Sequence, residues 1–384
     1  MSPTSPSSPA TDGNLALAPL SRGDRVGLLT SGGDAPGMNT GVRAAAKVGA
    51  ALGLEMLGVE DGYKGLIEGR IRATDPRALD DAARRGGTVL GTARSKEFRT
   101  PEGQVAARAQ IIAHRLKGLI VLGGDGSLTG ARTLDGAPTH DGATLRVVGM
   151  PASIDNDLGC TSMAIGVDTA MNTIMEACDR IADTALAHQR TFIVEVMGRD
   201  CGYLAMTAGI AAGADAVLFR EGGKSDDEIV DQVMRAIEAA YARPSGRRHV
   251  LVIKSEGVRF PSEKLKAAVD ARVQAKGGRF AEVDTRVTVL GHVVRGGSPT
   301  AFDRLLASRL ANVAVRAVHA GRTQEMAGWA IPGQTHPPSP WDPHVSLWPL
   351  DKVLDETARM HSGATELARW RVKALAEAEP VLYL

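Results

Sequence analysis

The sequence predicts an α/β fold in which helices cover a mainly parallel sheet. From Arg25 onward, short apolar runs that end in glycine-rich turns alternate with segments of helical period, which is the pattern of a sheet covered by helices. In such folds, ligands bind at the carboxyl ends of the strands, where these turns lie. The chain has 384 residues, and single hydrophobic cores stop growing near about 250–300 residues. We therefore expect two domains, with the chemistry in the turns.

The elements follow a leader of 23 residues. Ser and Pro dominate this leader, and it has neither a basic start nor a long apolar core, so it is predicted to be disordered. The clearest strands are the apolar runs at residues 25–33, 118–127, 145–153, 191–200 and 249–257. Residues 171–187 carry apolar side chains at helical spacing, which predicts a helix with a stripe facing the core. This stripe consists of Met171, Ile174, Met175, Cys178, Ile181, Ala182 and Ala185.

The chain beyond about Gly321 differs in composition from the part before it. All four Trp residues lie there, and residues 331–344 are repeatedly interrupted by Pro. We expect an extended coil over residues 331–344, because Pro cannot continue regular structure, and one helix over residues 355–378.

Composition excludes several classes of function. Lys and Arg total 45 and Asp and Glu total 44, so no surplus of charge draws the protein toward nucleic acid or an anionic membrane. The longest uncharged stretch, residues 201–214, falls short of the ~20 apolar residues of a membrane span. Cys160, Cys178 and Cys201 are too few for a disulfide framework or a four-ligand zinc site. A reducing, cytoplasmic setting fits this composition best.

Two glycine-rich turns are candidates for phosphate binding. Residues 30–39 and 121–130 each place Gly-Gly-Asp directly after an apolar strand, where backbone N–H groups can approach phosphate oxygens and a following helix adds a favourable dipole. One such turn is weak support, but two on separate strands favour phosphate. Asp125 in the second turn is well placed to hold Mg²⁺. The Gly-Lys-Ser near residue 224 does not fit a P-loop; Ser225 and Glu228 instead form a capping-box pattern that opens a helix.

Asp155 and Asp157 flank Asn156 just after a strand, and they either carry chemistry or only form an Asx-type turn. Arginines also gather in polar turns at strand ends, where several together suggest bidentate phosphate recognition. They are Arg94, Arg99, Arg190, Arg199, Arg286 and Arg295.

Six segments in order closely resemble the 6-phosphofructokinase family: residues 28–39, 86–99, 121–131, 153–157, 187–205 and 290–304. The similarity runs from about Arg25 to about Gly321. It implies transfer of the γ-phosphoryl group of a nucleotide to the 1-hydroxyl of fructose 6-phosphate with Mg²⁺, a step of glycolysis. The implied fold has two similar three-layer α/β/α domains with mainly parallel sheets. Residues 24–166 plus about 294–344 would bind nucleotide, and residues 167–293 plus about 345–384 would bind sugar phosphate.

The resemblance also implies a role for each matching residue. Asp155 would be the general base, with Ser153 and Arg199 beside the transferring group and Asp125 on Mg²⁺. The nucleotide would be held by Gly33, Arg94, Gly124, Gly126, Ser127 and Gly130. The sugar would be held by Asp157, Met197, Glu256 and His292, and its 6-phosphate by Arg295. Arg190 and Arg286 correspond to arginines that a neighbouring subunit supplies, which implies a homo-oligomer, most often a tetramer.

The phosphoryl donor follows from two positions. Relatives that use pyrophosphate carry Asp in place of Gly126 and Lys in place of Ala152, so the resemblance favours ATP. A pyrophosphate-dependent enzyme, a kinase of a related sugar such as sedoheptulose 7-phosphate, and a non-catalytic paralogue that senses sugar phosphate are the alternatives. Effector control like that of the familiar bacterial members of the family is not expected, because the arginines of their effector site are matched only in part. Arg43 matches, Lys47 is a change of type, and Pro76 and Ala182 stand where arginines are expected.

Overall fold

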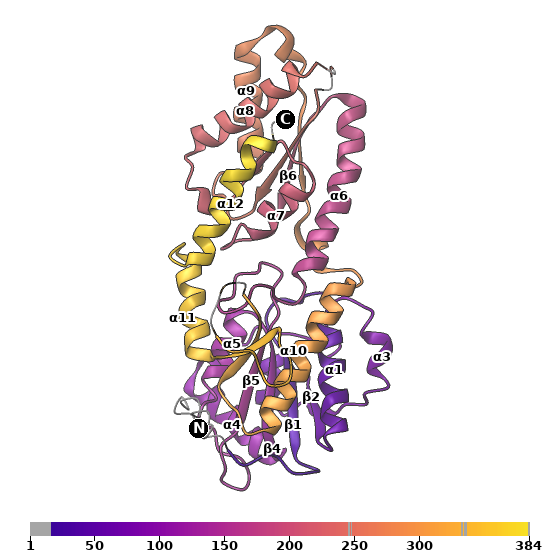
Figure 1. The fold of residues 1–384 in the computed structure, drawn as a ribbon, viewed down its shortest axis with the longest axis vertical. Helices are drawn as coiled ribbons and strands as arrows, with labels where there is room; N and C mark the ends of the chain where they lie inside the picture. Colours follow the sequence, from indigo (N-terminus) through magenta and orange to yellow (C-terminus); the bar gives the residue numbers. More distant parts are fainter. Residues whose placement is uncertain (1–16, 245, 247, 332, 334–335, 383–384) are drawn as a thin grey trace, which may run out of the picture.

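The computed structural model describes residues 17–382 apart from 245, 247, 332, 334 and 335. Two α/β domains lie one above the other along the long axis of the molecule (Figure 1). The lower domain is built on a seven-stranded sheet and the upper one on a four-stranded sheet. This is the predicted arrangement of mainly parallel sheets covered by helices.

The first domain has the strand order β11-β10-β5-β4-β1-β2-β3, and only the pairs β2/β3 and β10/β11 are antiparallel. The strands are β1 (Arg25–Thr30), β2 (Glu55–Val59), β3 (Ile71–Ala73), β4 (Leu116–Gly123), β5 (Arg146–Pro151), β10 (Glu325–Trp329) and β11 (Val345–Pro349). One face is covered by α1 (Met38–Ala51) and α10 (Ala301–His319). The other face is covered by α2 (Gly62–Glu68), α4 (Pro101–Ala113), α5 (Asp125–Arg132) and α11 (Leu350–His361). The short α3 (Leu79–Ala82) contacts α1.

Burial on both faces explains why these strands read as continuous apolar runs. Successive residues point to opposite faces, so Leu28 belongs to the core under α1 and α10, while Leu29 belongs to the core under α2, α4 and α5. Both side chains are fully buried.

The second domain has the strand order β7-β8-β6-β9, and all pairs are parallel. The strands are β6 (Thr191–Val196), β7 (Ala216–Leu218), β8 (Val250–Ser255) and β9 (Thr285–Val289). The helices α6 (Val167–His188) and α7 (Tyr203–Ala211) pack on one face, and α8 (Asp226–Ala242) and α9 (Ser262–Lys276) on the other. The predicted capping box is present at the start of α8, where Ser225 and Glu228 exchange hydrogen bonds.

The chain crosses between the domains three times: at the start of α6, between the short helix η4 (Gly291–Arg295) and α10, and between α11 and α12 (Glu366–Leu382). The first two crossings are joined by Asp303 on α10. Its carboxylate accepts hydrogen bonds from the backbone N–H groups of Gly166 and Thr169 and from the Thr169 hydroxyl. The third crossing runs along the opposite side of the molecule, drawn in yellow in Figure 1.

The five predicted strands and the helix over residues 171–187 are present as β1, β4, β5, β6, β8 and the body of α6. In the stripe, Ile174, Cys178 and Ala185 are buried, and Met171 and Ile181 are partly buried against the same core.

The predicted disordered leader needs a correction. Residues 1–16 lie outside the described part of the chain, but residues 17–23 are placed against the first domain. The backbone N–H groups of Leu17 and Leu20 donate to the carbonyl oxygens of Gly321 and His319 at the end of α10. Leu20 is buried, so its apolar side chain holds this segment.

The predicted tail needs two corrections. The single helix expected over residues 355–378 is broken, because Gly363 has a φ of 74° and Thr365 caps α12 by accepting a hydrogen bond from the N–H of Ala368. The return to the second domain was expected from residue 345, but β11 pairs with β10 in the first sheet and the chain crosses only after His361. Of the coil expected over residues 331–344, residues 332, 334 and 335 lie outside the described residues, and the rest contains one isolated bridge, Ser339 to Asp342.

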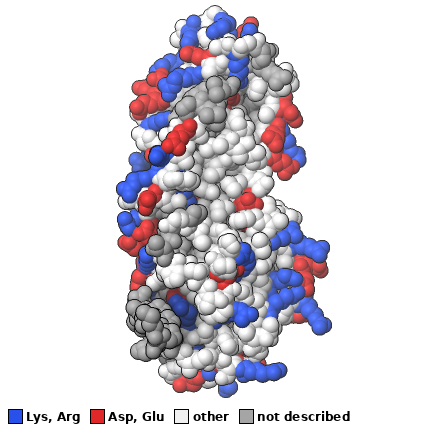
Figure 2. All heavy atoms as spheres, viewed as in Figure 1, with Lys and Arg blue, Asp and Glu red and all other residues white. Residues whose placement is uncertain are grey.

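The surface agrees with the balanced composition. Figure 2 shows acidic and basic side chains mixed along the edges of the molecule, with a largely uncharged centre on this face. In the described residues, no helix combines the length and apolar content needed to cross a membrane.

Candidate active site

The acidic turn, residues 153–159, follows the carboxyl end of β5. Asn156 at its centre has a φ of 50° and is buried. Its side-chain amide donates to the carbonyl oxygen of Ser162, 2.9 Å away, and accepts from the N–H of Ala164 at 3.0 Å. Asn tolerates the left-handed region better than most residues. The side chain of Asn156 therefore ties the centre of the turn to residues 162–164 of its own segment.

The two carboxylates lie in different surroundings. Ser153 Oγ donates to one oxygen of Asp157 at 2.8 Å, and His361 Nε2 lies 3.3 Å from the other. By contrast, Oδ1 of Asp155 is buried and has no hydrogen-bond partner among the described residues. Both carboxylate oxygens of Asp157 therefore have a partner, whereas Asp155 keeps an acceptor oxygen without one in the described residues.

This difference separates the pKa values of the pair. Burial, and then the charge of Asp157, raise the pKa of Asp155 to about 7, although the charge of Arg295 partly offsets the rise. Burial alone would raise the pKa of Asp157, but the hydrogen bonds from His361 and Ser153 outweigh it and leave that pKa below its usual value. Titratable neighbours whose pKa values are driven apart are candidates for a base and its supporting acid. Of the two, Asp155 is the group whose pKa lies near neutral pH.

Two glycine-rich turns stand beside the acidic turn. Since β1, β4 and β5 are parallel neighbours, their carboxyl ends meet at one edge of the sheet, with Thr30 opposite Leu122 and Gly123 opposite Pro151. The first turn contains Gly33, and the second contains Gly124 and Gly126. The helix α5 begins at Asp125, so its N-terminal N–H groups and dipole face the same edge. A Cβ at Gly126 would meet open space, which leaves room for a ligand there.

Other segments brace these turns. The hydroxyl of Thr92 donates to the carbonyl oxygen of Gly32 at 2.7 Å, which fixes the segment carrying the exposed Arg94 against the first turn. Ser127 is buried, and its carbonyl oxygen accepts a 2.7 Å hydrogen bond from the Tyr63 hydroxyl. No motif in the sequence pointed to Tyr63, whose ring stacks on Phe98 with centroids 4.1 Å apart.

Two of the predicted nucleotide-binding glycines also have a packing role. A Cβ at Gly130 would lie 2.7 Å from the Tyr63 ring, so this glycine lets the ring pack against α5. A Cβ at Gly33 would lie within contact of the Arg295 guanidinium, which reaches across from the second domain and donates to the carbonyl oxygen of Asp34 at 3.3 Å. Arg295, expected on the sugar's 6-phosphate, thus lies against the first glycine-rich turn, which is expected to bind phosphate of the nucleotide.

Asp125 is the metal candidate. It is half-buried, and desolvation and the charge of Asp157 raise its pKa, while the charge of His361 acts in the opposite direction. No group of three His, Cys, Asp or Glu side chains that could hold a metal occurs among the described residues. Mg²⁺ usually takes one or two carboxylates together with substrate phosphates and water. The donor set at Asp125 fits that pattern.

The residues expected to hold the sugar follow the strands of the second sheet. Met197 and Glu256 come directly after β6 and β8, and the N–H of Glu256 donates to the carbonyl oxygen of Val196 at 2.8 Å. Met197 is buried, whereas Arg199 and His292 are exposed at the same end of the strands.

Arg190 and Arg286 lie apart from this group. Both guanidinium groups donate to the carboxylate of Asp284, at 2.8 Å in each case. Arg190 directly precedes β6 and Arg286 is the second residue of β9, so both lie at the amino ends of strands whose carboxyl ends carry Met197 and His292. Within one chain, the structure does not bring these arginines together with the other predicted sugar ligands.

This geometry can be compared with known proteins. A family model described as Phosphofructokinase matches residues 25–318. The chain belongs to the phosphofructokinase family. It is similar to the ATP-dependent 6-phosphofructokinases of Natranaerobius thermophilus, at 44% identity over 306 residues, and of Brevibacillus brevis, at 45% over 306 residues. Each match covers 79% of this chain and 89% of the relative.

The solved structure of Pichia pastoris phosphofructokinase in the T-state shares the fold, with a TM-score of 0.81 and 32% identity. The match covers 96% of this chain and 43% of that one, so this chain spans less than half the length of the yeast protein. The family model ends at residue 318, whereas the structural match extends into the tail, which reaches the acidic turn.

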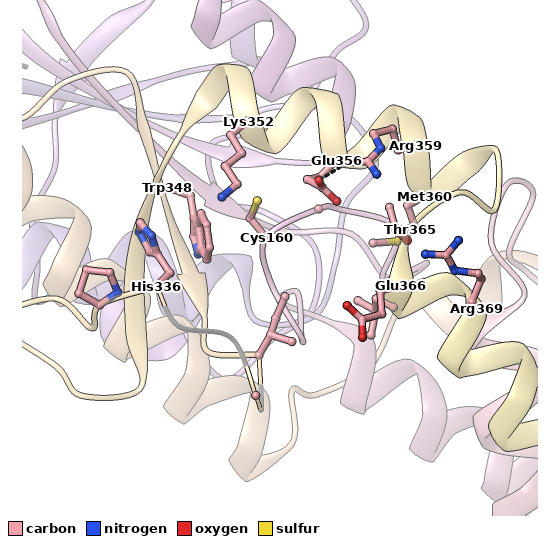
Figure 3. A pocket seen from close by; sticks show the side chains of 15 residues that line it. Cys160, His336, Trp348, Lys352, Glu356, Arg359, Met360, Thr365, Glu366 and Arg369 are labelled. Carbon is pink, nitrogen blue, oxygen red and sulfur yellow. Dashed lines mark hydrogen bonds and ion pairs between the residues drawn. The ribbon is translucent and has the colours of Figure 1, made fainter. Parts of the chain in front are cut away.

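Two tail residues at the acidic turn, His361 and Arg371, are absent from the sequence prediction. A histidine and an arginine in a helical segment read as ordinary surface residues, and no motif marks their partners. Figure 3 shows the neighbouring surface, a cavity of about 640 Å³ between α11, the start of α12 and the coil before β11. Cys160 lines it from the end of the acidic turn, and burial raises the pKa of this thiol to about 12, which makes it unreactive.

Proposed function

We propose that this chain is an ATP-dependent 6-phosphofructokinase, which transfers the γ-phosphoryl group of ATP to the 1-hydroxyl of fructose 6-phosphate. The proposal is supported chiefly by the difference in pKa between two neighbouring carboxylates. The pKa of Asp155 is about 7, whereas that of Asp157 lies below its usual value, so Asp157 is an anion at neutral pH. The pair stands beside two glycine-rich turns at one sheet edge. Family membership and the names of relatives covered over most of their length point to the same activity.

In the proposed mechanism, Asp155 accepts the proton of the attacking sugar hydroxyl. Phosphoryl transfer needs such an acceptor together with positive charge and N–H groups on the phosphate oxygens. The free oxygen of Asp155 supplies the acceptor. Arg199 and Ser153 are proposed beside the transferring group, and the backbone of Gly33 and of residues 124–127, with Arg94, on the nucleotide phosphates. Mg²⁺ held at Asp125 would neutralise charge on the transferred phosphate.

Gly126 supports ATP as the donor. Since nothing in this chain fills the space that a side chain there would take, the packing of the protein itself does not require glycine. A carboxylate at that position would crowd and repel the nucleotide phosphates. Ala152 is the second position that bears on the donor. It has no charge and is buried, so this position supplies no cation for pyrophosphate.

Arg190 and Arg286 support an assembly with shared active sites. Because they lie at the end of the second sheet remote from Met197 and Glu256, they can reach a sugar phosphate only in another subunit's site. We therefore propose a homo-oligomer, a tetramer in the simplest case, in which Asp157, Met197, Glu256, His292 and Arg295 of one chain bind fructose 6-phosphate. A cytoplasmic, glycolytic role is proposed with it, in keeping with three free, buried thiols.

The function is tested by supplying Mg²⁺ and fructose 6-phosphate with ATP in one assay and with pyrophosphate in another. Fructose 1,6-bisphosphate is expected from ATP alone. Product from pyrophosphate alone would overturn the donor assignment made from Gly126. A folded oligomer that binds fructose 6-phosphate but forms no product from either donor would establish the sensing paralogue instead.

A further inference from the structure

We infer that the C-terminal helices position the acidic turn, with His361 holding the carboxylate of Asp157 and Arg371 holding the backbone of Asn156. This inference rests on the proposed function, because it gives the turn the role of carrying the general base. Both residues lie beyond residues 25–318, the span of the family model.

The turn needs external support. Asn156 has a left-handed backbone, which Asn adopts more readily than most residues but still at a cost that surrounding contacts offset. The Asn156 side chain is occupied by Ser162 and Ala164 on its own segment. Its carbonyl oxygen accepts a hydrogen bond from Arg371 Nη1 at 3.0 Å, which ties the centre of the turn to α12.

The guanidinium group of Arg371 is buried and enclosed by several side chains. Arg371 is only 6% exposed, and its guanidinium carbon lies 4.4 Å from the centre of the Tyr203 ring. Nη1 also approaches the sulfur atoms of Cys201, at 3.5 Å, and Met360, at 3.7 Å. In the described part of the chain, these hydrogen-bond and ring contacts are all with neutral groups. The acidic residue Glu221 lines the same small cavity as Arg371. The direct hydrogen bond from the buried guanidinium nevertheless goes to the carbonyl oxygen of Asn156, and it fixes the position of that carbonyl group.

The helix α11 adds two contacts on the other side of the turn. His361 Nε2 lies 3.3 Å from Oδ2 of Asp157, whose second oxygen is bound by Ser153. Two residues further along, the N–H of Gly159 donates to the Thr357 hydroxyl at 2.9 Å. The turn is thus held at its centre by α12 and at its end by α11, and Asp155 lies directly beside these anchors.

The crossing makes this arrangement a link between the domains. The helix α11 packs on α5 of the first domain, while α12 packs on α7 and β7 of the second. As Figure 1 shows, the two helices run along one side of both domains. A shift of one domain relative to the other would therefore move the anchors of the turn.

The first test compares His361→Ala and His361→Gln with Arg359→Ala, a control at an exposed position of the same helix. A misplaced reacting group can cost up to ~10²-fold in rate, so His361→Ala is expected to lower kcat by about tenfold or more, with KM for both substrates nearly unchanged. The Gln amide can still donate to Asp157 and should restore most of the loss. Equal kcat in parent and His361→Ala, or a Gln variant as slow as the Ala variant, would overturn the inference.

The second test does not depend on activity. Amide hydrogen exchange in residues 153–164 is expected to be faster by about tenfold or more in His361→Ala and in Arg371→Met, which keeps volume but removes the donors, and unchanged in Arg369→Met. Unchanged exchange in His361→Ala would overturn the positioning role even if Arg371→Met fails to fold. A parent that forms no product with ATP would contradict the proposed function, while the exchange data would still decide the inference.

Discussion

Two carboxylates that are shielded from solvent differ in their hydrogen bonds: the fully buried Asp303 at the first pair of domain crossings, and the partly buried Asp155 in the acidic turn, whose Oδ1 is buried. Burial raises the pKa of both. Asp303 is fully buried and accepts three hydrogen bonds from the start of α6. Asp155 keeps a buried oxygen with no partner in the described residues. The first arrangement stabilises the fold, whereas the second leaves a proton acceptor ready for a ligand.

This contrast teaches that burial alone does not mark a functional acid. A buried group whose hydrogen bonds are all satisfied contributes to stability, and one left unsatisfied costs stability. Such a cost persists in a folded protein where the group serves a purpose, and functional sites are where such groups concentrate. Substitutions at the two acids, and changes of pH, test whether their roles differ in this way.

The largest expected effect is the loss of activity as the pH is lowered. A base must be deprotonated to act, so kcat/KM for fructose 6-phosphate should fall about tenfold per pH unit below the pKa of Asp155, which is about 7 in the free protein. At pH 5 the expected loss is about a hundredfold. A profile that is flat from pH 8 to pH 5 would show that Asp155 does not limit the reaction in this way.

Removing the satisfied carboxylate should act on stability. Asp303→Ala would leave two backbone N–H groups and a hydroxyl unpaired where the domains join. We expect a loss of about 3 kcal/mol or more in the free energy of unfolding, since each buried unpaired group costs about 1–3 kcal/mol. Denaturant unfolding measures this, and kcat of the remaining folded protein should stay within about twofold of the parent. A stable Asp303→Ala protein with lost activity would reverse the contrast.

Removing the unsatisfied carboxylate should act the other way on stability. Above its unfolded pKa near ~3.9 the free aspartate ionises easily, but in the fold it resists ionisation until about pH 7. The folded state therefore binds more protons than the unfolded state between these values, and Asp155 lowers stability as pH rises. Asp155→Asn should be more stable than the parent by about 1–3 kcal/mol at pH 8, with the difference shrinking toward pH 4. Thermal unfolding at both pH values tests this.

The smallest effect is expected at the break between α11 and α12. Gly363 has a φ of 74°, which any residue with a Cβ adopts at a cost. Gly363→Ala should reduce the free energy of unfolding by about 1 kcal/mol, whereas Ala364→Gly at the neighbouring position provides the control for a simple change of composition. No loss of stability in Gly363→Ala would mean that the break does not depend on this backbone conformation.

Much of the fold was predictable because its signals are local. Apolar runs that are buried on both faces of a sheet are recognisable as strands. The capping box at Ser225 and the glycine turns after β1 and β4 could also be recognised in the sequence. The tail was predicted less well. Gly363, which ends α11, and Thr365, which begins α12, are recognisable signals of helix ends. They were overlooked because the helical pattern of apolar residues continues on both sides of them.

The site was predictable to the extent that its residues occur in motifs. Asp155, Asp125 and the glycines lie in short stretches with a recognisable order. His361 and Arg371 could not be predicted, because their partners lie 204 and 215 residues away in the chain. The pKa difference between Asp155 and Asp157 has the same origin, since it depends on burial and on a donor from the tail.

The proposed role of Asp155 as the base of an ATP-dependent phosphofructokinase can be tested by substituting this residue alone. The rate of fructose 1,6-bisphosphate formation from saturating ATP and fructose 6-phosphate is measured for the parent and for Asp155→Asn, with binding of fructose 6-phosphate checked in both. The account predicts a variant that folds and binds the sugar phosphate nearly as well as the parent, while its kcat is lower by at least ~10²-fold. A variant with near-parental kcat would contradict the account.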